Sequence, residues 1–191
     1  MSAGAPTSTS MTTEEMLALP ENGNDRHLIR GELRETPMTR RNQWHSTVEA
    51  NLAHLLLQWL RQRPGRDGRV VSGEAGFRLR RAPDTTVGID VAYVAAEVVA
   101  RTPRSSAFFE GPPVLAVEIL SPSDKQEEIA EKVEVYKETG VELIWIVDPV
   151  LQTVLVLRAG EEPELFNVRQ ELSGEPHLPG FREPVAEVFR S

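Results

Sequence analysis

Two carboxylates interrupt otherwise apolar segments of this chain. Glu118 lies inside the run Val114–Leu120, and Asp90 lies inside the run Val87–Val94. A carboxylate buried in a strand costs several kcal/mol unless it is paired or binds a cation. Because the chain has no cysteine, two such oxygen donors predict a site for Mg²⁺ or Mn²⁺. The alternatives are an edge strand that leaves Glu118 in water and a strand-end turn at Asp90.

The cation best placed to join these carboxylates is Lys132, on a helix expected over residues 124–139. On a helical wheel, Lys132 falls beside the apolar stripe of that helix, from where it could reach over the sheet. The residues of the stripe are Ile129, Val133 and Tyr136. The alternative is a surface ion pair with Glu128, which would contribute only a few tenths of a kcal/mol. The two apolar strands that each hold a carboxylate favour the first interpretation.

Two more polar residues are candidates for the same site. His45 belongs to a long helix that begins at Asn42, and it shares a face with Glu49 four residues later. Its imidazole could shuttle protons, contact a phosphate or support another catalytic group. Glu32 follows the tight turn at Gly31 and is a further acidic candidate. Either residue could equally be an ordinary surface group.

Hydrophobic spacing, Pro and Gly predict the elements that carry these residues. The expected strands cover residues 27–30, 32–36, 69–72, 76–80, 87–94, 114–120, 141–147 and 153–157. The expected helices cover residues 13–19, 42 to the residue before Pro64, 124–139 and 184–189, with a helical turn at 95–100. Capping boxes are expected at Thr12 and at Ser123, and Gly140 is expected to end the helix that starts after Ser123.

The unit of strand 114–120, helix 124–139 and strand 141–147 predicts a right-handed βαβ crossover with two parallel strands. The other strands are close in sequence, as in hairpins. We therefore expect an α/β (α+β) fold with a mixed central β-sheet flanked by helices. Residues 1–11 are small and polar and are expected to form a disordered tail, which leaves residues 12–191 as a single domain.

Composition excludes several classes of protein. The 191 residues are 40% apolar and 26% charged, and the lack of cysteine excludes disulfide scaffolds, cysteine zinc sites and thiol catalysis. Ser121 and Ser123 have no evident His and Asp partners, so a serine hydrolase is not expected. No apolar run approaches the ~20 residues of a membrane helix, and the N-terminus lacks a signal-peptide pattern. We expect a cytoplasmic protein that makes no membrane contact.

Charge is distributed unevenly along the chain. The net charge is −8, and residues 111–191 hold 7 basic and 16 acidic residues. Any nucleic-acid contact is therefore expected in the first half, where arginines are frequent. The candidates are Arg40, Arg41, Arg61, Arg63, Arg66, Arg69, Arg78, Arg80 and Arg81. The alternative is that these arginines are paired with nearby carboxylates such as Asp67, Glu74 and Asp84.

Several of these segments together resemble a known family. The segments are Gly31–Leu33, His45, Asp90–Val94, Val117–Ser123, Glu131-Lys132, Tyr136, Gly140-Val141 and Trp145–Pro149. In this combination the chain resembles the Uma-type restriction endonucleases of the PD-(D/E)XK nuclease superfamily. The resemblance extends from about Thr12 to Phe189. It implies a restriction-endonuclease-like core with a divalent metal site.

The resemblance also implies roles for individual residues. Asp90, Glu118 and the backbone carbonyl of Ile119 would hold Mg²⁺ or Mn²⁺. The superfamily usually has a Lys two residues after the Glu, where this chain has Leu120. Lys132 matches the place to which that Lys has moved in this family.

Three smaller points follow from the same resemblance. His45 and Glu32 match further positions at the family's site. Ile89 replaces a Pro that shapes the backbone only, so we do not expect its absence to affect the chemistry.

Three functions are compatible with these observations. The first is a metal-dependent endonuclease that hydrolyses DNA phosphodiester bonds. The second is a catalytically weak binding or assembly module on the nuclease fold, which the acidic second half of the chain favours. The third is a hydrolase of RNA or of small phosphodiesters. We also expect a homodimer or a larger homo-oligomer, because Trp145 and the segment 150–157 supply more apolar surface than a terminal hairpin usually exposes.

Overall fold

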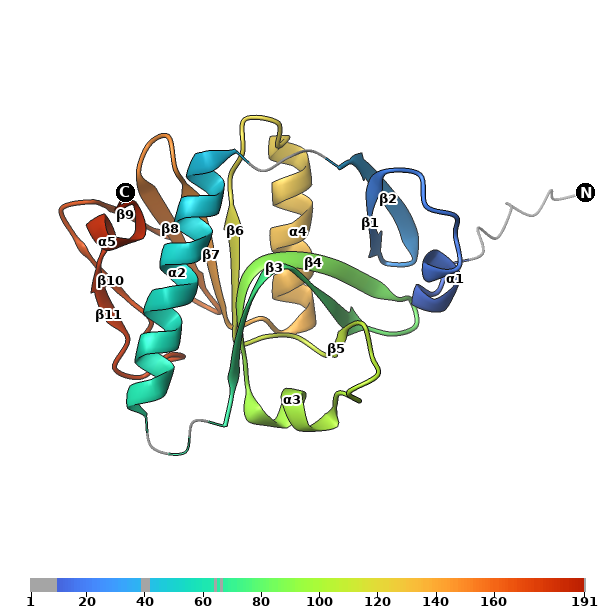
Figure 1. The fold of residues 1–191 in the computed structure, drawn as a ribbon, viewed down its shortest axis with the longest axis horizontal. Coiled ribbons are helices and arrows are strands. Elements are labelled where there is room, and N and C mark those ends of the chain that lie inside the picture. Colours follow the sequence, from blue (N-terminus) through green and yellow to red (C-terminus); the bar gives the residue numbers. More distant parts are fainter. Residues whose placement is uncertain (1–9, 39–41, 64, 66, 191) are drawn as a thin grey trace, which may run out of the picture.

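The most apolar strands lie in the middle of a large mixed sheet. A computed structural model describes residues 10–38, 42–63, 65 and 67–190. Within these residues, the main sheet runs in the order β2-β1-β4-β6-β7-β8-β9, with β3 and β5 joined to it through β4 (Figure 1). Its strands are β1 Asn24–Ile29, β2 Glu32–Pro37, β3 Arg69–Arg80, β4 Thr85–Val94, β5 Phe109–Glu110, β6 Leu115–Ile119, β7 Leu143–Asp148, β8 Thr153–Arg158 and β9 Glu164–Asn167.

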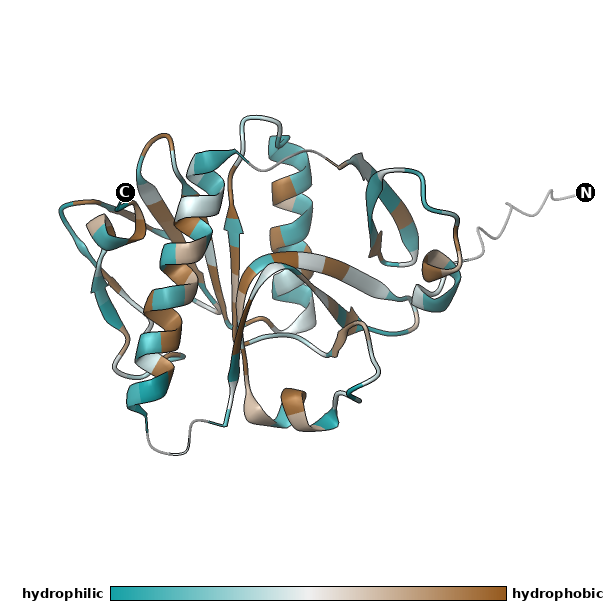
Figure 2. Cartoon of the chain, viewed as in Figure 1, coloured by the Kyte–Doolittle hydropathy of each residue, from teal (hydrophilic) through white to brown (hydrophobic). Residues whose placement is uncertain are grey.

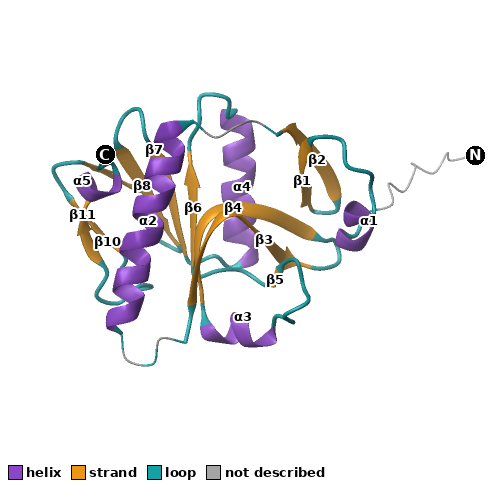
Figure 3. Ribbon diagram, viewed as in Figure 1, coloured by secondary structure: helices purple, strands orange, loops and turns teal. Residues whose placement is uncertain are grey.

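Helices and a small second sheet complete the fold (Figure 3). The helices are α1 Thr13–Leu17, α2 Gln43–Gln62, α3 Ala96–Arg101, α4 Gln126–Thr139 and α5 Val185–Val188. The small sheet consists of β10 Glu171–Ser173 and β11 Arg182–Pro184. No helix in the described part of the chain has both the length and the apolar character to cross a membrane.

The expected βαβ crossover is present. Strands β6 and β7 are parallel and are joined by α4, whereas β4 pairs with β6 and β8 pairs with β7 in antiparallel register. The central sheet is therefore mixed and flanked by helices, which confirms the predicted fold class. Because β6 and β7 are parallel, both strands end at the same edge of the sheet, and loops that follow them share that edge.

Alternating residues of the central strands face two different helices. Val91 and Val117 belong to the core that contains the apolar stripe of α2, whereas Ala92 and Ala116 belong to the core that contains Tyr136 of α4. The side chains of a strand alternate between its two faces, so α2 and α4 cover opposite faces of the sheet. Figure 2 shows mostly hydrophobic colours along the central strands.

Local signals at the helix ends were mostly predictive. The Thr12–Glu15 capping box is present, Asn42 caps α2 through the His45 N–H, and Gly140 ends α4 with φ 88°. The expected tail over residues 1–11 lies largely outside the described residues.

Two local predictions were wrong. Ser123 does not cap α4, because the side chains around it form a separate turn in which Asp124 accepts the Ser121 N–H at 2.7 Å. Residues 69–80 form one strand, β3, in place of two. That strand stays continuous because a β-bulge absorbs the irregularity between Ser72 and Ala75.

Asp84 joins the first helix to the sheet. Its Oδ2 accepts both the N–H and the hydroxyl of Thr13, at 2.9 and 2.7 Å, and the Thr13 hydroxyl also contacts Thr86 at 2.7 Å. Burial raises the pKa of Asp84, but the hydrogen bonds from Thr13 and Ala82 outweigh it, so the pKa lies below its ordinary value of 3.8. The ionised form is therefore the one that stabilises the fold.

Replacement of this anchor should destabilise the protein in a pH-dependent way. We expect Asp84→Asn to lower the free energy of unfolding by about 1–3 kcal/mol at neutral pH, the range for a buried polar network that loses a charged acceptor. Because the folded pKa is depressed, this contribution is complete above pH ~4 and disappears as the pH falls through the folded pKa. Urea unfolding between pH 3 and 7 measures it. Exposed Asp67→Asn is the control, and an equal effect in both variants would contradict the assignment.

Candidate active site

The sheet opens between β4 and β6 at Asp90. The two strands pair from Tyr93 and Leu115 to Val91 and Val117, and the next residues in register are Asp90 and Glu118. In place of a further backbone bond, Oδ2 of Asp90 accepts the Ile119 N–H at 2.8 Å. Since opposed residues of an antiparallel pair share a face, the side chains of Asp90 and Glu118 lie on the same side of the sheet.

Helix α4 supplies two partners for the Glu118 carboxylate. The Lys132 ammonium donates to Oε2 at 2.7 Å, and the Tyr136 hydroxyl donates to Oε1. Lys132 also donates to the carbonyl of Gly88 at 3.2 Å, which fixes its position between β4 and β6. The side chain of Glu118 is only 5% exposed and that of Lys132 is 16% exposed. Both oxygens of this buried carboxylate are therefore held by donors from one helix.

Helix α2 reaches the same point from the other face. His45 lies in the first turn of α2, is fully buried, and places Nε2 3.3 Å from Oδ2 of Asp90. Its Nδ1 lies 3.8 Å from Glu49. Because Asp90 occupies the gap where the strands separate, groups from the two helical layers reach adjacent carboxylates, His45 at Asp90 and Lys132 at Glu118.

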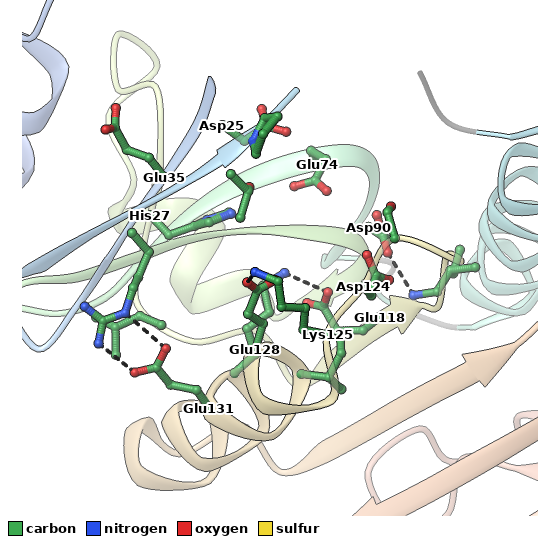
Figure 4. Close-up of a pocket in the computed structure, with 18 residues that line it drawn as sticks. Asp25, His27, Glu35, Glu74, Asp90, Glu118, Asp124, Lys125, Glu128 and Glu131 are labelled. Carbon is green, nitrogen blue, oxygen red and sulfur yellow. Dashed lines mark hydrogen bonds and ion pairs between the residues drawn. The ribbon is translucent and has the colours of Figure 1, made fainter. Parts of the chain in front are cut away.

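A pocket of about 500 Å³ exposes these groups. Asp90, Glu118 and Lys132 lie in its wall, together with residues of the β1–β2 hairpin, the bulge of β3 and the first half of α4. Figure 4 shows Asp90 and Glu118 close together on one side, with Glu74 and His27 across from them. Eight of the lining residues are carboxylic acids: Asp25, Glu35, Glu74, Asp90, Glu118, Asp124, Glu128 and Glu131.

The pKa values of the two central carboxyls are shifted in opposite directions. Burial raises the pKa of Asp90, but the His45 imidazole, the Ile119 N–H and the Lys132 charge together lower it below its ordinary value. For Glu118, burial dominates, and despite Lys132 and Tyr136 its pKa is raised. Burial and the neighbouring Glu118 raise the pKa of Tyr136 well above 10, so its hydroxyl stays protonated and acts as a donor.

Four of the five candidate side chains meet, as expected from their positions in apolar strands and on the helices. Lys132 reaches over the sheet to Glu118 and does not pair with Glu128. The partner of Glu128 is Lys125, at 2.8 Å. The stripe of α4 is rotated from the predicted one: Val135 and Tyr136 are its buried residues, whereas Ile129 and Val133 are half-buried.

Glu32 is the exception. It starts the edge strand β2, its side chain is 68% exposed, and it pairs with Arg34 at 3.0 Å. It does not line the pocket. Glu32 therefore lies apart from the four side chains that meet, because an edge strand leaves its side chain in solvent.

Glu74, His27 and Asp25 also line the pocket, although no sequence pattern had singled them out for it. Glu74 reaches it through the β3 bulge, in which Gly73 and Glu74 lie opposite the single residue Asp90 and both have positive φ. His27 accepts the Gly88 N–H at 3.3 Å. The Gly73-Glu74 pair inside a strand pattern was an available signal, because an isolated Gly there indicates a bulge.

Among the described residues, none of the candidate arginines lines the pocket. Arg61 and Arg63 lie at the far end of α2 from His45, roughly 24 Å away at 1.5 Å per residue. Arg78 is buried and pairs with Glu14 and Glu110, at 2.6 and 3.3 Å. The prediction that Arg78 contacts phosphates was therefore wrong. Arg40, Arg41 and Arg66 lie outside the described residues.

The donor set fits a hard cation that keeps part of its water shell. Among the described residues, no three His, Cys, Asp or Glu side chains form a metal site by themselves. The available donors are two carboxylates and the carbonyl of Ile119, which points toward β4 because the Ile119 N–H does so. Mg²⁺ binds in this way, through one or two carboxylates plus waters and substrate phosphates.

Comparison with known proteins identifies the family. A family model described as "Putative restriction endonuclease" matches residues 13–186. The chain belongs to the Uma2 family. This finding confirms the resemblance in the sequence, and it covers the strands and helices that carry Asp90, Glu118, Lys132 and His45.

A solved structure shows the same fold. The crystal structure of a "putative nuclease belonging to DUF820" from Anabaena variabilis ATCC 29413 superposes with a TM-score of 0.77 at 22% sequence identity. The match covers 94% of this chain and 97% of that chain. None of the curated proteins matches this Uma2 chain.

Removal of the Lys132 charge should destabilise the protein mainly at high pH. In Lys132→Met, Glu118 loses its counter-charge and its pKa rises further above the ordinary value. A raised folded pKa gives stability that is present at low pH and lost as the pH increases. We therefore expect a loss of about 3 kcal/mol at pH 8, and a much smaller loss near pH 4.5.

Denaturant unfolding with EDTA present measures this difference. The control is Lys125→Met, which removes an exposed ion pair from the start of the same helix and should change stability by less than ~0.5 kcal/mol. A pH-independent loss in Lys132→Met would show that Glu118 does not depend on this lysine.

Proposed function

We propose that this Uma2 protein is a metal-dependent endonuclease that hydrolyses DNA phosphodiester bonds. The observation that carries the proposal is the meeting of Asp90, Glu118 and Lys132 in one pocket at the edge where β6 ends. Buried charges of this kind are costly for folding, and a hydrophobic packing of similar volume would often serve stability better. Their retention is accounted for by chemistry on an anionic substrate.

Asp90, Glu118 and the Ile119 carbonyl would hold Mg²⁺ or Mn²⁺. When bound, such an ion supplies a water of lowered pKa and stabilises negative charge on the phosphate. Asp90 is suited to this role because its carboxyl stays ionised across the neutral range, since its pKa is lowered. Glu118 is held in one orientation by Lys132 and Tyr136, so its remaining lone pairs face a fixed direction.

Lys132 has the position of a group that stabilises the transition state. Its ammonium is anchored by Glu118 and the Gly88 carbonyl, and it has three protons to donate. The third proton is available to a phosphate oxygen or to the attacking water. His45 acts behind Asp90, where its Nε2 contacts the carboxylate and orients it. We propose no role for Glu32.

Cleavage assays with matched variants test this function. We expect supercoiled plasmid to be cut in Mg²⁺ or Mn²⁺ and not in EDTA. Asp90→Asn and Lys132→Ala should each reduce the rate at least ~100-fold, the lower range for loss of one essential group. The Asn amide oxygen can still accept the Ile119 N–H, so Asp90→Asn should fold.

The control is Glu128→Gln, because Glu128 also lines the pocket but pairs with exposed Lys125. RNA and a small phosphodiester are assayed in parallel. Cleavage of RNA alone would change the substrate, and equal residual activity in Asp90→Asn would contradict the site. Unaltered Mn²⁺ affinity in Asp90→Asn would also contradict it.

We further propose that the protein is a homodimer. Trp145, Val154 and Val156 are buried within the chain, so the apolar hairpin is less available than its sequence indicated. The tip of the hairpin does remain exposed, with Val150 at 79% and Leu151 at 71%. A cytoplasmic location stays a prediction from the sequence.

The oligomeric state can be measured directly. Light scattering at micromolar concentration should give twice the monomer mass of 21.3 kDa. We expect the double variant Val150→Asp with Leu151→Asp to give the monomer mass, because two charges in an apolar interface are costly to desolvate. Leu17→Asp, at an exposed apolar position on α1, is the control. A monomeric parent protein would refute the dimer.

A further inference from the structure

A second, smaller pocket adjoins the candidate active site. It measures about 130 Å³, and three of its lining residues, Asp25, His27 and Glu74, also line the larger pocket. Figure 4 shows Asp25 and Glu74 across the larger pocket from Glu128 and Glu131 of α4. Because the two pockets share a wall, a ligand bound in the larger one can extend into the smaller one.

Two glycines lie opposite each other in the small pocket. Gly76 of β3 and Gly88 of β4 are partners in the sheet register. Neither has a positive φ, so the backbone conformation does not require glycine at these positions. A Cβ added to Gly76 would lie 2.5 Å from the Phe108 ring, and one added to Gly88 would lie 2.4 Å from the Glu74 carboxylate. Glycine weakens a strand and often marks a close approach of a ligand to the backbone, so this pair indicates a floor kept free for a flat group.

Lys132 connects this glycine floor to the candidate active site. Its ammonium donates to the Gly88 carbonyl at 3.2 Å and to Glu118 at 2.7 Å. Gly88 precedes Asp90 by two residues on β4, so both positions face the same side of the sheet. A phosphate bound at Asp90 and Glu118 would therefore have the glycine floor beside it.

The charges around the small pocket do not favour a second phosphate. Among the described residues that line it, Arg26 is the only lysine or arginine. All three guanidinium nitrogens of Arg26 already donate, to Glu35 and to two backbone carbonyls. The volume of about 130 Å³ is also below the ~300 Å³ of a small ligand site, so this pocket fits one ring of a ligand and not a whole ligand.

We propose that the small pocket binds the nucleobase next to the scissile phosphate. Phe108 supplies an aromatic wall, and the Ser106 hydroxyl fixes its backbone by accepting the Phe108 N–H at 3.2 Å. Every base has a π-face that can stack on such a ring, and this contact needs no positive charge. The inference rests on the proposed nuclease function and adds the substrate class, a strand whose base at the site lies outside the double-helical stack.

A mononucleotide tests the small pocket without cleavage, because it contains no internal phosphodiester bond. The parent protein is titrated in Mg²⁺ with deoxyadenosine monophosphate and with deoxyribose phosphate, and binding is followed by ligand-observed NMR. Both ligands offer a phosphate to the metal site, so the difference between them is the contribution of the base. We expect the nucleotide to bind about ten-fold more tightly, within the range for one stacked base. Equal affinities would overturn the proposal, and so would binding of neither ligand.

Variants of the wall and the floor locate the contribution of the base. Phe108→Leu keeps an apolar side chain beside Gly76 but removes the ring, so it should lose most of the difference between the two ligands and bind deoxyribose phosphate as the parent does. Gly76→Ala should have the same effect, because its Cβ displaces the ring. The control Ser105→Ala changes an exposed residue of the same loop and should bind both ligands normally. Normal binding of the nucleotide by Phe108→Leu would contradict the assignment.

Cleavage separates failure of this inference from failure of the proposed function. If the parent protein cuts plasmid in Mg²⁺ but binds the two ligands equally, the base pocket alone is wrong. If the base-dependent binding is present but no nucleic acid is cut, the small pocket binds bases and the nuclease assignment is wrong. Thermal unfolding of Phe108→Leu and Gly76→Ala at the parent temperature shows that the variants fold.

Discussion

The hydrogen bond from the Ile119 N–H to Asp90 sets the geometry of the whole site. At this point a side-chain oxygen replaces a backbone carbonyl as the acceptor between β4 and β6. The two strands remain joined, so the backbone donor is satisfied, yet they separate enough to leave a carboxylate between them. On the other neighbour of β4, the bulge of β3 places two residues opposite Asp90. The opening at Asp90 therefore has two causes, the side-chain bond to β6 on one side of β4 and the β3 bulge on the other.

This opening lets the two helical layers cooperate. In a closed sheet, the strands would separate the side chains of α2 from those of α4. Because Asp90 lies in the gap, His45 approaches it from the α2 side while Lys132 serves Glu118 from the α4 side. The site thus draws on four elements whose mutual positions are fixed by two separate hydrophobic cores. Packing errors in either core would misplace part of the site.

The sequence predicted what depends on local pattern. Asn42 and Gly140 act at their helix ends through contacts within a few residues, and Asp90 and Glu118 were visible because polar residues are unusual in apolar strands. The remaining features depend on long-range pairing. The exposed position of Glu32 depends on which strand forms the sheet edge, which no local pattern indicates. Tyr136 was counted as core, and only the packing of α4 over β6 shows that its hydroxyl reaches Glu118.

The position of Lys132 has a further physical consequence. A lysine at position 120 would follow Glu118 on the same face of β6, but the strand ends at Ile119 and Leu120 occupies that place. The ammonium instead comes from the crossover helix, which lies over the strand that it serves. Its distance to Glu118 is then set by the packing of α4 on the sheet, through Val135 and Tyr136. The Tyr136 ring packs α4 against the sheet, and its hydroxyl donates to the other oxygen of Glu118. This one residue therefore couples the position of α4 on the sheet to the orientation of the carboxylate. A helix that shifts on the sheet would lose both contacts together, so the charge pair and the core stabilise the same arrangement.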